Sequence, residues 1–125
     1  MILSRVGMDN PQIVNMLRAG YRDGLTPPTR NTEFYLASED NHLIGMCGVV
    51  WHKGHCRFKG DYVRPEFRHR GYWQRMMNLR IQMARDRQCE TVTAVCTPVA
   101  LPLWLDRGAI VVKRFKRFTR VSLEL

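Results

Sequence analysis

The amino-acid sequence predicts an α+β fold, with a mixed, mostly antiparallel sheet flanked by helices in the order β-α-β-β-β-α-β-α-β-β. In its central part, short strand-like runs follow one another with tight polar turns between them, which indicates an antiparallel meander. Two stretches, one on either side of the meander, carry apolar residues at helical spacing. A length of 125 residues suits one domain, so we expect residues 1–125 to fold as a single unit.

The N-terminal part is expected to form a strand, a helix and a loop. A short strand is predicted over Ile2 to Val6. Asn10 followed by Pro11 is typical of a helix start, because an Asx side chain caps the first turn and proline fits within it. Apolar residues then recur at helical spacing, which predicts a helix from about Asn10 to Ala19. The stretch from Gly20 to Asn31 contains two glycines and a pair of prolines, which indicates a loop.

Three consecutive strands are predicted in the central part, over Glu33 to Ser38, Leu43 to Trp51 and Cys56 to Val63. The turn before the last of these strands contains His52 and His55, which together with Cys56 are candidate metal ligands. However, side chains that flank a hairpin turn are expected to point apart, and no fourth ligand lies at a suitable spacing. We therefore expect an exposed polar turn and no metal site.

A basic loop and the clearest helix of the chain come after the meander. The loop runs from Arg64 to Gly71, and the helix begins directly after it. The apolar stripe of this helix consists of Met76, Met77, Leu79, Ile81, Met83 and Ala84. The arginines that lie mostly off the stripe are Arg75, Arg80, Arg85 and Arg87. The methionines are expected to pack in the core.

The C-terminal part is expected to contain a strand, a short helix and two further strands. Thr91 to Cys96 is apolar and β-branched, which predicts a strand. A short helix is predicted over Pro98 to Leu105, ended by Gly108. Apolar and polar residues alternate over Ile110 to Leu125, which predicts two strands joined near Phe115 to Arg117. An exposed edge in this last region could pair in a homodimer.

The chain is strongly basic, with a formal net charge of +9 at pH 7. This excess favours a polyanionic partner, such as nucleic acid, a phosphorylated cofactor or an acidic protein surface, although solubility alone is an alternative explanation. Five cations near the C-terminus alternate with two phenylalanines. These cations are Lys113, Arg114, Lys116, Arg117 and Arg120. Such a run suits contact with nucleic acid or an acidic protein, and the alternative is a strand pair with its rings inward and its charges in water.

The cysteines and the lack of long apolar runs indicate the compartment. The four cysteines form no CxxC pair and lie among apolar residues, so buried reduced thiols are expected. No apolar run reaches the roughly 20 residues of a membrane span, and the first residues form no signal-peptide core. We therefore expect a soluble, cytoplasmic protein with no membrane partner.

A strand, a glycine-containing basic turn and a helix start succeed one another between Asp61 and Trp73. This arrangement suits phosphate binding, because free N–H groups and the dipole at a helix N-terminus favour anions. Gly71 allows close backbone approach and an unusual φ angle. The alternative is a solvated basic loop.

This segment resembles the signature of the GCN5-related N-acetyltransferase (GNAT) superfamily. Residues 61–71, DYVRPEFRHRG, are similar to the family's apolar strand, V-x-P and R/Q-x-x-G-x-G/A run before a long helix. A second, independent match lies downstream, where residues 97–108, TPVALPLWLDRG, resemble the family's N-x-x-A-x-x-L-Y-x-x-x-G segment. The order of elements over Ile2 to Leu125 also fits, so the resemblance covers nearly the whole chain.

The resemblance implies a site for acetyl-CoA or another acyl-CoA. The pyrophosphate is expected against the backbone amides of residues 68–73, and the pantetheine arm along the preceding strand edge. The residues thereby assigned to the cofactor are Tyr62, Val63, Arg68, His69, Arg70, Gly71, Tyr72 and Trp73. In enzymes of this family an amine attacks the thioester directly within a ternary complex. Their acceptor pockets imply roles here for Gly20 to Asn31 and Phe115 to Phe118.

Asp61 is the candidate general base. On a strand it shares the face of Val63, so its carboxylate would lie beside the reactive thioester and accept a proton from an ammonium substrate. The alternative is an ion pair with a nearby arginine.

Three positions depart from the family pattern. Trp73 stands where the motif has Gly or Ala, against the expected pyrophosphate, and Thr97 replaces the usual Asn. Trp104 replaces the tyrosine that often protonates the leaving thiolate, and an indole cannot deliver that proton at neutral pH. Tyr62 and Tyr72 are therefore candidate substitute acids.

The sequence therefore predicts an acyl-CoA-dependent N-acyltransferase that carries an acyl group, most simply acetyl, to an amine. One alternative is a nucleic-acid modifying or binding protein on the same fold, since some phage adenine-modifying enzymes are thought to belong to this superfamily. Another is a non-catalytic relative, in which Trp73 closes the cofactor site and the basic surface binds a partner.

Overall fold

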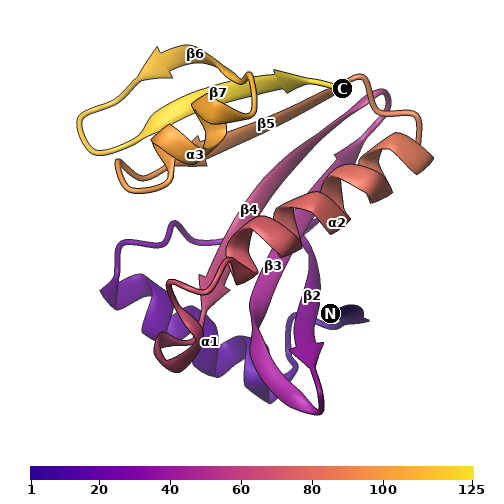
Figure 1. Cartoon of the computed structure of the whole chain (residues 1–125), viewed down its shortest axis with the longest axis vertical. Coiled ribbons are helices and arrows are strands. Elements are labelled where there is room, and N and C mark those ends of the chain that lie inside the picture. Colours follow the sequence, from indigo (N-terminus) through magenta and orange to yellow (C-terminus); the bar gives the residue numbers. More distant parts are fainter.

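The computed structural model describes all 125 residues and contains seven strands, three α-helices and one short 3-10 helix (Figure 1). In chain order the elements are β1 (Ile2–Val6), α1 (Pro11–Arg22), β2 (Glu33–Glu39), β3 (His42–His52), β4 (His55–Val63), η1 (Pro65–Phe67), α2 (Tyr72–Asp86), β5 (Thr91–Cys96), α3 (Leu101–Asp106), β6 (Ile110–Arg114) and β7 (Thr119–Glu124). This order confirms the predicted succession of strands and helices. None of the helices combines the length and apolar character needed to cross a bilayer.

All seven strands belong to one sheet, in the spatial order β1-β2-β3-β4-β5-β7-β6. Every neighbouring pair is antiparallel except β4 and β5, which run parallel. The predicted mixed, mostly antiparallel α+β sheet is therefore confirmed. The outer strands are β1 and β6, whereas β7 lies inside the sheet, so the free edge in the C-terminal region is that of β6. Pairing of that edge in a homodimer stays a prediction.

The parallel pair at the centre of the sheet stays together over only part of its length. Paired residues run from His55 opposite Thr91 to Phe58 opposite Ala94. Beyond Phe58, β4 continues to Val63 without a partner on its β5 side, and the two strands diverge (Figure 1). Backbone groups along the last part of β4 therefore have no strand partner on that side.

The helices divide between the two faces of the sheet. On one face, α2 and α3 cover the main core, which includes Phe58, Met76, Met77, Trp104 and Val121. On the other face, α1 covers a smaller core, which consists of Ile13, Met16, Leu17, Phe34 and Met46. The sheet is thus enclosed on both faces near β3 and β4.

The first helix is longer than the sequence predicted. Oδ1 of Asn10 accepts a hydrogen bond from the Gln12 N–H at 2.9 Å, as expected of the cap, but the helix continues through Gly20 to Arg22. Gly20 is buried, and a Cβ atom there would lie 2.7 Å from Cδ2 of Leu25. The glycine allows this leucine to pack closely against the helix, so the prediction that Gly20 begins the loop is wrong.

The short helix α3 begins later than predicted. The carbonyl oxygen of Thr97 accepts hydrogen bonds from the N–H groups of Ala100, at 3.1 Å, and Leu101, at 3.0 Å. Residues 97–100 therefore form a turn ahead of the helix, which starts at Leu101 instead of Pro98.

The buried face of α2 differs from the predicted stripe. Arg80 is 0% exposed, whereas Leu79, which was assigned to the stripe, is 37% exposed. Arg80 lies four residues after Met76 and four before Ala84, so these three residues share one buried face. The assignment of Arg80 to the region off the stripe is therefore wrong.

The turn between β3 and β4 brings its two histidines together. His52 pairs with His55 across the hairpin, and their rings stack with centroids 4.6 Å apart. Directly opposite residues share a face, which is why the two side chains do not point apart as predicted. Cys56 is buried in the main core, and no group of three potential metal ligands forms.

All four cysteines are buried and free, as the sequence predicted. Burial raises the pKa of Cys47 to about 12, and burial together with Cys89 raises the pKa of Cys56 to about 12. These thiols therefore stay protonated, and hence poorly nucleophilic, at neutral pH.

Glu39, at the end of β2, joins three parts of the chain. Its carboxylate accepts hydrogen bonds from Arg75 on α2, with Nη1 to Oε2 at 3.0 Å, and from the N-terminal ammonium of Met1 at 3.3 Å. The Tyr72 hydroxyl also bonds to it. The bonds from Arg75 are the main reason why the pKa of Glu39 falls to about 2.

We expect the Glu39→Gln variant to unfold at a lower temperature than the wild type at pH 7. A carboxylate with a lowered folded pKa stabilises the fold above its unfolded pKa of about 4.3. That contribution is lost as the pH falls through the pKa of about 2 that Glu39 has in the folded protein. The difference in melting temperature between variant and wild type should therefore shrink on acidification. Circular-dichroism melts at pH 7 and about pH 3 measure it, with Glu66→Gln as an exposed control. A difference that does not change with pH would contradict this assignment.

Candidate active site

A bulge in β4 lies where this strand leaves β5. Between Lys59 and Tyr62, β4 has two residues, Gly60 and Asp61, opposite a single residue of β3. Gly60 has a φ of +71°, which favours glycine, and a Cβ atom there would lie 2.7 Å from the Phe34 ring. The extra residue shifts the alternation of side chains, so that Asp61 points to the sheet face covered by α2.

A cleft of about 670 Å³ lies at the divergence of β4 and β5. Residues 59–63 of β4, residues 94–96 of β5 and Thr97 line it, together with the loop before α2 and the side of α3. The end of α1 and the loop after it close the opposite side, where Phe118 also contributes. The structure thus brings part of both predicted acceptor segments, Gly20–Asn31 and Phe115–Phe118, to the same cleft.

The loop before α2 presents a row of free backbone N–H groups to this cleft. His69 and Gly71 both have positive φ angles, of 63° and 79°. The Arg68 N–H donates to Pro65 and the Arg75 N–H donates to Gly71, but the six N–H groups of residues 69–74 make no hydrogen bond within the chain. Successive free N–H groups in such a turn, at the start of a helix, form a concave site for an anion.

Arg68 fixes this loop to its surroundings. Its Nε donates to the carbonyl oxygen of Val63 at 2.8 Å, and Nη2 lies 3.3 Å from Oδ2 of Asp23 at the end of α1. The guanidinium also lies over the Tyr62 ring, 5.2 Å from its centroid. The Arg70 side chain is exposed and has no carboxylate partner, so its charge is available to an anion on the loop.

Asp61 forms a bidentate ion pair with the buried Arg80. Oδ1 accepts from Nη1 at 2.7 Å, and Oδ2 accepts from Nη2 at 2.6 Å. Arg80 also donates to the carbonyl oxygen of Gly48 at 3.0 Å, and its guanidinium lies 4.3 Å from the centroid of Phe58. The ion pair considered as the alternative for Asp61 is thus present, and the role of Asp61 as a general base stays a prediction.

Trp73 completes this cluster. Its indole Nε1 donates to Oδ2 of Asp61 at 2.9 Å, and its ring meets that of Trp104 edge-on, with centroids 6.3 Å apart. Trp104 is almost fully buried and packs against Phe58. The Trp73 side chain is therefore held between β4 and α3, while its backbone N–H belongs to the free row of the loop.

The two candidate acids face different surroundings. Tyr72 is the first residue of α2, and its hydrogen bond to Glu39 raises the pKa of its phenol. Tyr62 packs against the smaller core under α1, and thus on the opposite sheet face from Asp61. Both tyrosines line the cleft, and an acid role for either stays a prediction.

The cations predicted for the C-terminal hairpin have no carboxylate within 4.0 Å. Phe115 is 41% exposed, so the alternative in which both rings point inward is wrong for this residue. The ring of Phe115 is instead flanked by Lys113, with Nζ at 5.1 Å, and Arg120, with Cζ at 5.4 Å. Phe118 is half-buried and lines the cleft.

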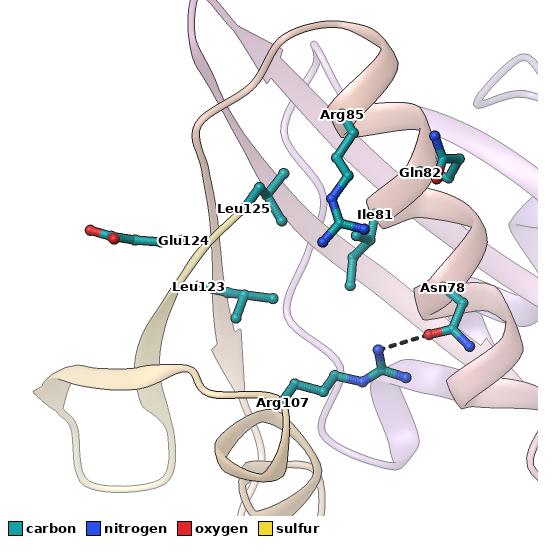
Figure 2. A pocket seen from close by; sticks show the side chains of 8 residues that line it. All are labelled: Asn78, Ile81, Gln82, Arg85, Arg107, Leu123, Glu124 and Leu125. Carbon is teal, nitrogen blue, oxygen red and sulfur yellow. Dashed lines mark hydrogen bonds between the residues drawn. The ribbon is translucent and has the colours of Figure 1, made fainter.

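A second, smaller hollow of about 400 Å³ lies between α2 and the end of β7 (Figure 2). Arg85 and Arg107 both line it, and Nη1 of Arg107 donates to Oδ1 of Asn78 at 2.8 Å. The free amide row and the Asp61 cluster line the larger cleft, which is therefore the candidate active site.

Arg80 is the principal residue of the site that the sequence interpretation missed. The signal was present in the helical periodicity, because position 80 comes four residues after buried Met76 and three after buried Met77. An arginine on an apolar face requires a buried acceptor, and Asp61 lies on the strand that precedes the loop and helix.

Comparison with protein-family models finds a match over residues 9–108 to the acetyltransferase (GNAT) family. No curated protein sequence matches the chain.

Solved structures with the same fold are numerous. A GNAT family acetyltransferase from Elizabethkingia anophelis with acetyl-CoA bound has a TM-score of 0.78 at 14% identity, covering 99% of this chain and 97% of that one. The IAA acetyltransferase from Bacillus cereus has a TM-score of 0.78 at 12% identity, covering 99% of both chains. The ribosomal-protein-S18-alanine N-acetyltransferase from Escherichia coli has a TM-score of 0.77 at 10% identity, covering 98% of this chain and 92% of that one.

Proposed function

The chain belongs to the acetyltransferase (GNAT) family, and from this premise we propose that it transfers an acyl group, most simply acetyl, from acyl-CoA to an amine. The observation that carries the proposal is the row of six free N–H groups, residues 69–74, beside the diverging strands. Acyl-CoA supplies an activated thioester and a pyrophosphate anion. A structure with this fold from Elizabethkingia anophelis holds acetyl-CoA, which supports the same cofactor here.

The residues of the loop fit the anionic part of the cofactor. Free N–H groups and the N-terminal dipole of α2 stabilise the pyrophosphate, the exposed Arg70 adds to the local positive potential, and the exposed His69 offers a ring N–H donor. Arg68 keeps the loop against β4 through Val63 and Asp23. Beyond Phe58, the free edge of β4 offers Tyr62 and Val63 to the pantetheine arm, which carries amide groups of its own.

The chemistry that remains for the protein is to orient the amine and remove its proton. We assign the proton to Asp61, because its carboxylate lines the cleft and is held there by Arg80. A carboxylate can accept about four hydrogen bonds and that of Asp61 accepts three, so Oδ1 keeps one free position. Trp73 and Arg80 hold this carboxylate in place.

The first test is binding of acetyl-CoA to the Gly71→Val variant. A β-branched residue is strained at the φ of +79° found here, so the loop must change shape and misalign its amides. Losing hydrogen bonds to a charged group costs about 1.5–3 kcal/mol, so calorimetry should give a dissociation constant about 10 to 100 times that of the wild type.

The control is Gly54→Val, in the turn between β3 and β4. Gly54 also has a φ of +79° and open space around it, so it carries the same strain at the opposite end of β4. Its affinity for acetyl-CoA should equal that of the wild type. Equal loss in both variants, or no binding by the wild type, would contradict the proposal and favour a non-catalytic or nucleic-acid role.

A further inference from the structure

The half of the sheet formed by β5, β7 and β6 is covered on one face only. The core under α1 draws its strand residues from β1 to β4 and includes none from β5, β6 or β7. On that uncovered face, Val95 of β5 is 38% exposed and Ile110 of β6 is 66% exposed. Because α2 and α3 occupy the other face, the surface beside α1 is open to a ligand.

Four cations share this open face. The register places Lys113 of β6 opposite Arg120 of β7, and Arg120 opposite Val95 of β5, so the three side chains point the same way. Thr93 of β5 comes two residues before Val95 and therefore shares its face. Arg57 of β4 lies opposite Thr93, so the Arg57 side chain is on this face as well. Lys59 lies two residues further along the same strand. We call Arg57, Lys59, Lys113 and Arg120 the basic band.

The basic band has no acidic partner. None of its four cations lies within 4.0 Å of a carboxylate. Lys113 and Arg120 instead flank the exposed ring of Phe115, which keeps both charges together at the surface. Burial and the charge of Arg57 lower the pKa of Lys59, and an anion bound beside it would stabilise its charged form.

The basic band leads into the candidate active site. Lys59 and Val95 line the cleft, as does Phe118 at the start of the hairpin's return strand. The two carboxylates that line the cleft are already paired, Asp23 with Arg68 and Asp61 with Arg80. Of the lysine and arginine side chains that line the cleft, Lys59 therefore has no carboxylate partner and can pair with an anionic ligand.

We propose that the acyl acceptor is an amine carried by an acidic peptide, which lies along the basic band with its amine in the cleft. The inference rests on the proposed acyl transfer. Strands in a sheet are about 4.8 Å apart, so the distance from β4 to β6 is about 14 Å, or about four residues of extended peptide. A free amino acid is too short to reach Lys59 and Lys113 together, whereas a peptide with several carboxylates matches the band in length and charge.

Nucleic acid fits the open face less well. Single-stranded nucleic acid binds basic surfaces through exposed aromatic rings on which successive bases stack. Of its phenylalanine, tyrosine and tryptophan rings, the open face exposes Phe115, and that ring is flanked by Lys113 and Arg120. Its other exposed large apolar side chains are aliphatic, as at Val95 and Ile110.

The test compares two synthetic peptides with the same free N-terminal amine, one continued by four glutamates and one by four glutamines. Release of CoA from acetyl-CoA gives kcat/KM for each peptide. We expect the wild type to prefer the glutamate peptide at low salt and to lose the preference as salt rises. In the Lys113→Gln/Arg120→Gln variant the preference should fall about tenfold, through KM, while the glutamine peptide reacts as before.

The matched control is Lys53→Gln/Arg85→Gln, which removes the same charge. Lys53 lies in the turn between β3 and β4, and Arg85 lies on α2 in the hollow of Figure 2, so neither belongs to the basic band. This variant should keep the wild-type preference. Equal kcat/KM for both peptides in the wild type would overturn the inference, as would equal loss of preference in the two double variants.

Binding measurements separate this inference from the acyl transfer on which it rests. Calorimetry with acetyl-CoA should give the same affinity for the wild type and both double variants. If the wild type binds no acetyl-CoA, the transfer proposal fails, and anisotropy of a labelled glutamate peptide still tests the basic band. If an oligodeoxynucleotide binds the band more tightly than that peptide, the acidic-peptide inference is wrong and a nucleic-acid partner replaces it.

Discussion

The Arg80→Met variant is expected to lose about 3–5 kcal/mol of folding stability, because it removes one partner of a buried ion pair. Arg80 is 0% exposed, and both of its terminal nitrogens donate to Asp61. Without the guanidinium, the Asp61 carboxylate keeps the indole of Trp73 as its hydrogen-bond donor. The carbonyl oxygen of Gly48 also loses a donor. A loss of this size is a large part of the stability of a small domain.

Urea unfolding, with circular dichroism as the readout, measures this loss. The Arg85→Met variant changes an exposed arginine of the same helix, and we expect its free energy of unfolding to lie within about 0.5 kcal/mol of the wild type. The double variant Arg80→Met/Asp61→Leu replaces the pair by apolar side chains. It should recover most of the lost stability, since neither charge is then left unpaired. A loss below about 1 kcal/mol for Arg80→Met would show that water replaces the guanidinium.

The regular elements were largely predictable because their signals are local. The cap at Asn10, the strand alternation and the polar turns each depend on neighbouring residues, and all appear where expected. The errors also have physical causes. Gly20 allows Leu25 to pack closely and does not end the helix, and only the three-dimensional position of Leu25 distinguishes these two roles of a glycine. Arg80 was assigned by its charge, although its spacing from Met76 places it on the buried face.

The candidate site was predictable in one half only. The loop that offers the free amides is one continuous segment, so Arg68 and Gly71 could be recognised by their order before a helix. The cluster around Asp61 joins residues 12 and 19 positions apart, on β4 and α2. The bulge at Gly60 turns Asp61 toward that helix, and no spacing in the sequence indicates a bulge. The basic band similarly depends on the order in which β7 enters the sheet between β5 and β6.

For Asp61→Asn, we expect turnover to fall about 100-fold, the usual size of a lost general base, while acetyl-CoA binds as in the wild type. The amide cannot accept the proton of an ammonium substrate, whereas the loop amides of residues 69–74 do not involve this side chain. In the variant, only amine that is already deprotonated reacts. Its kcat/KM should therefore rise about tenfold per pH unit below the pKa of the amine, more steeply than for the wild type.

The pH profile separates this role from a structural one, because Asp61 also holds Arg80 and Trp73. If the carboxylate only positions its neighbours, Asp61→Asn disturbs the start of α2, and affinity for acetyl-CoA falls together with turnover. The rate of the remaining enzyme then keeps the wild-type dependence on pH. Comparison with Trp73→Phe, which removes one hydrogen bond to the carboxylate and keeps a ring against Trp104, completes the test. That variant should leave the pH profile unchanged if the base is the carboxylate itself.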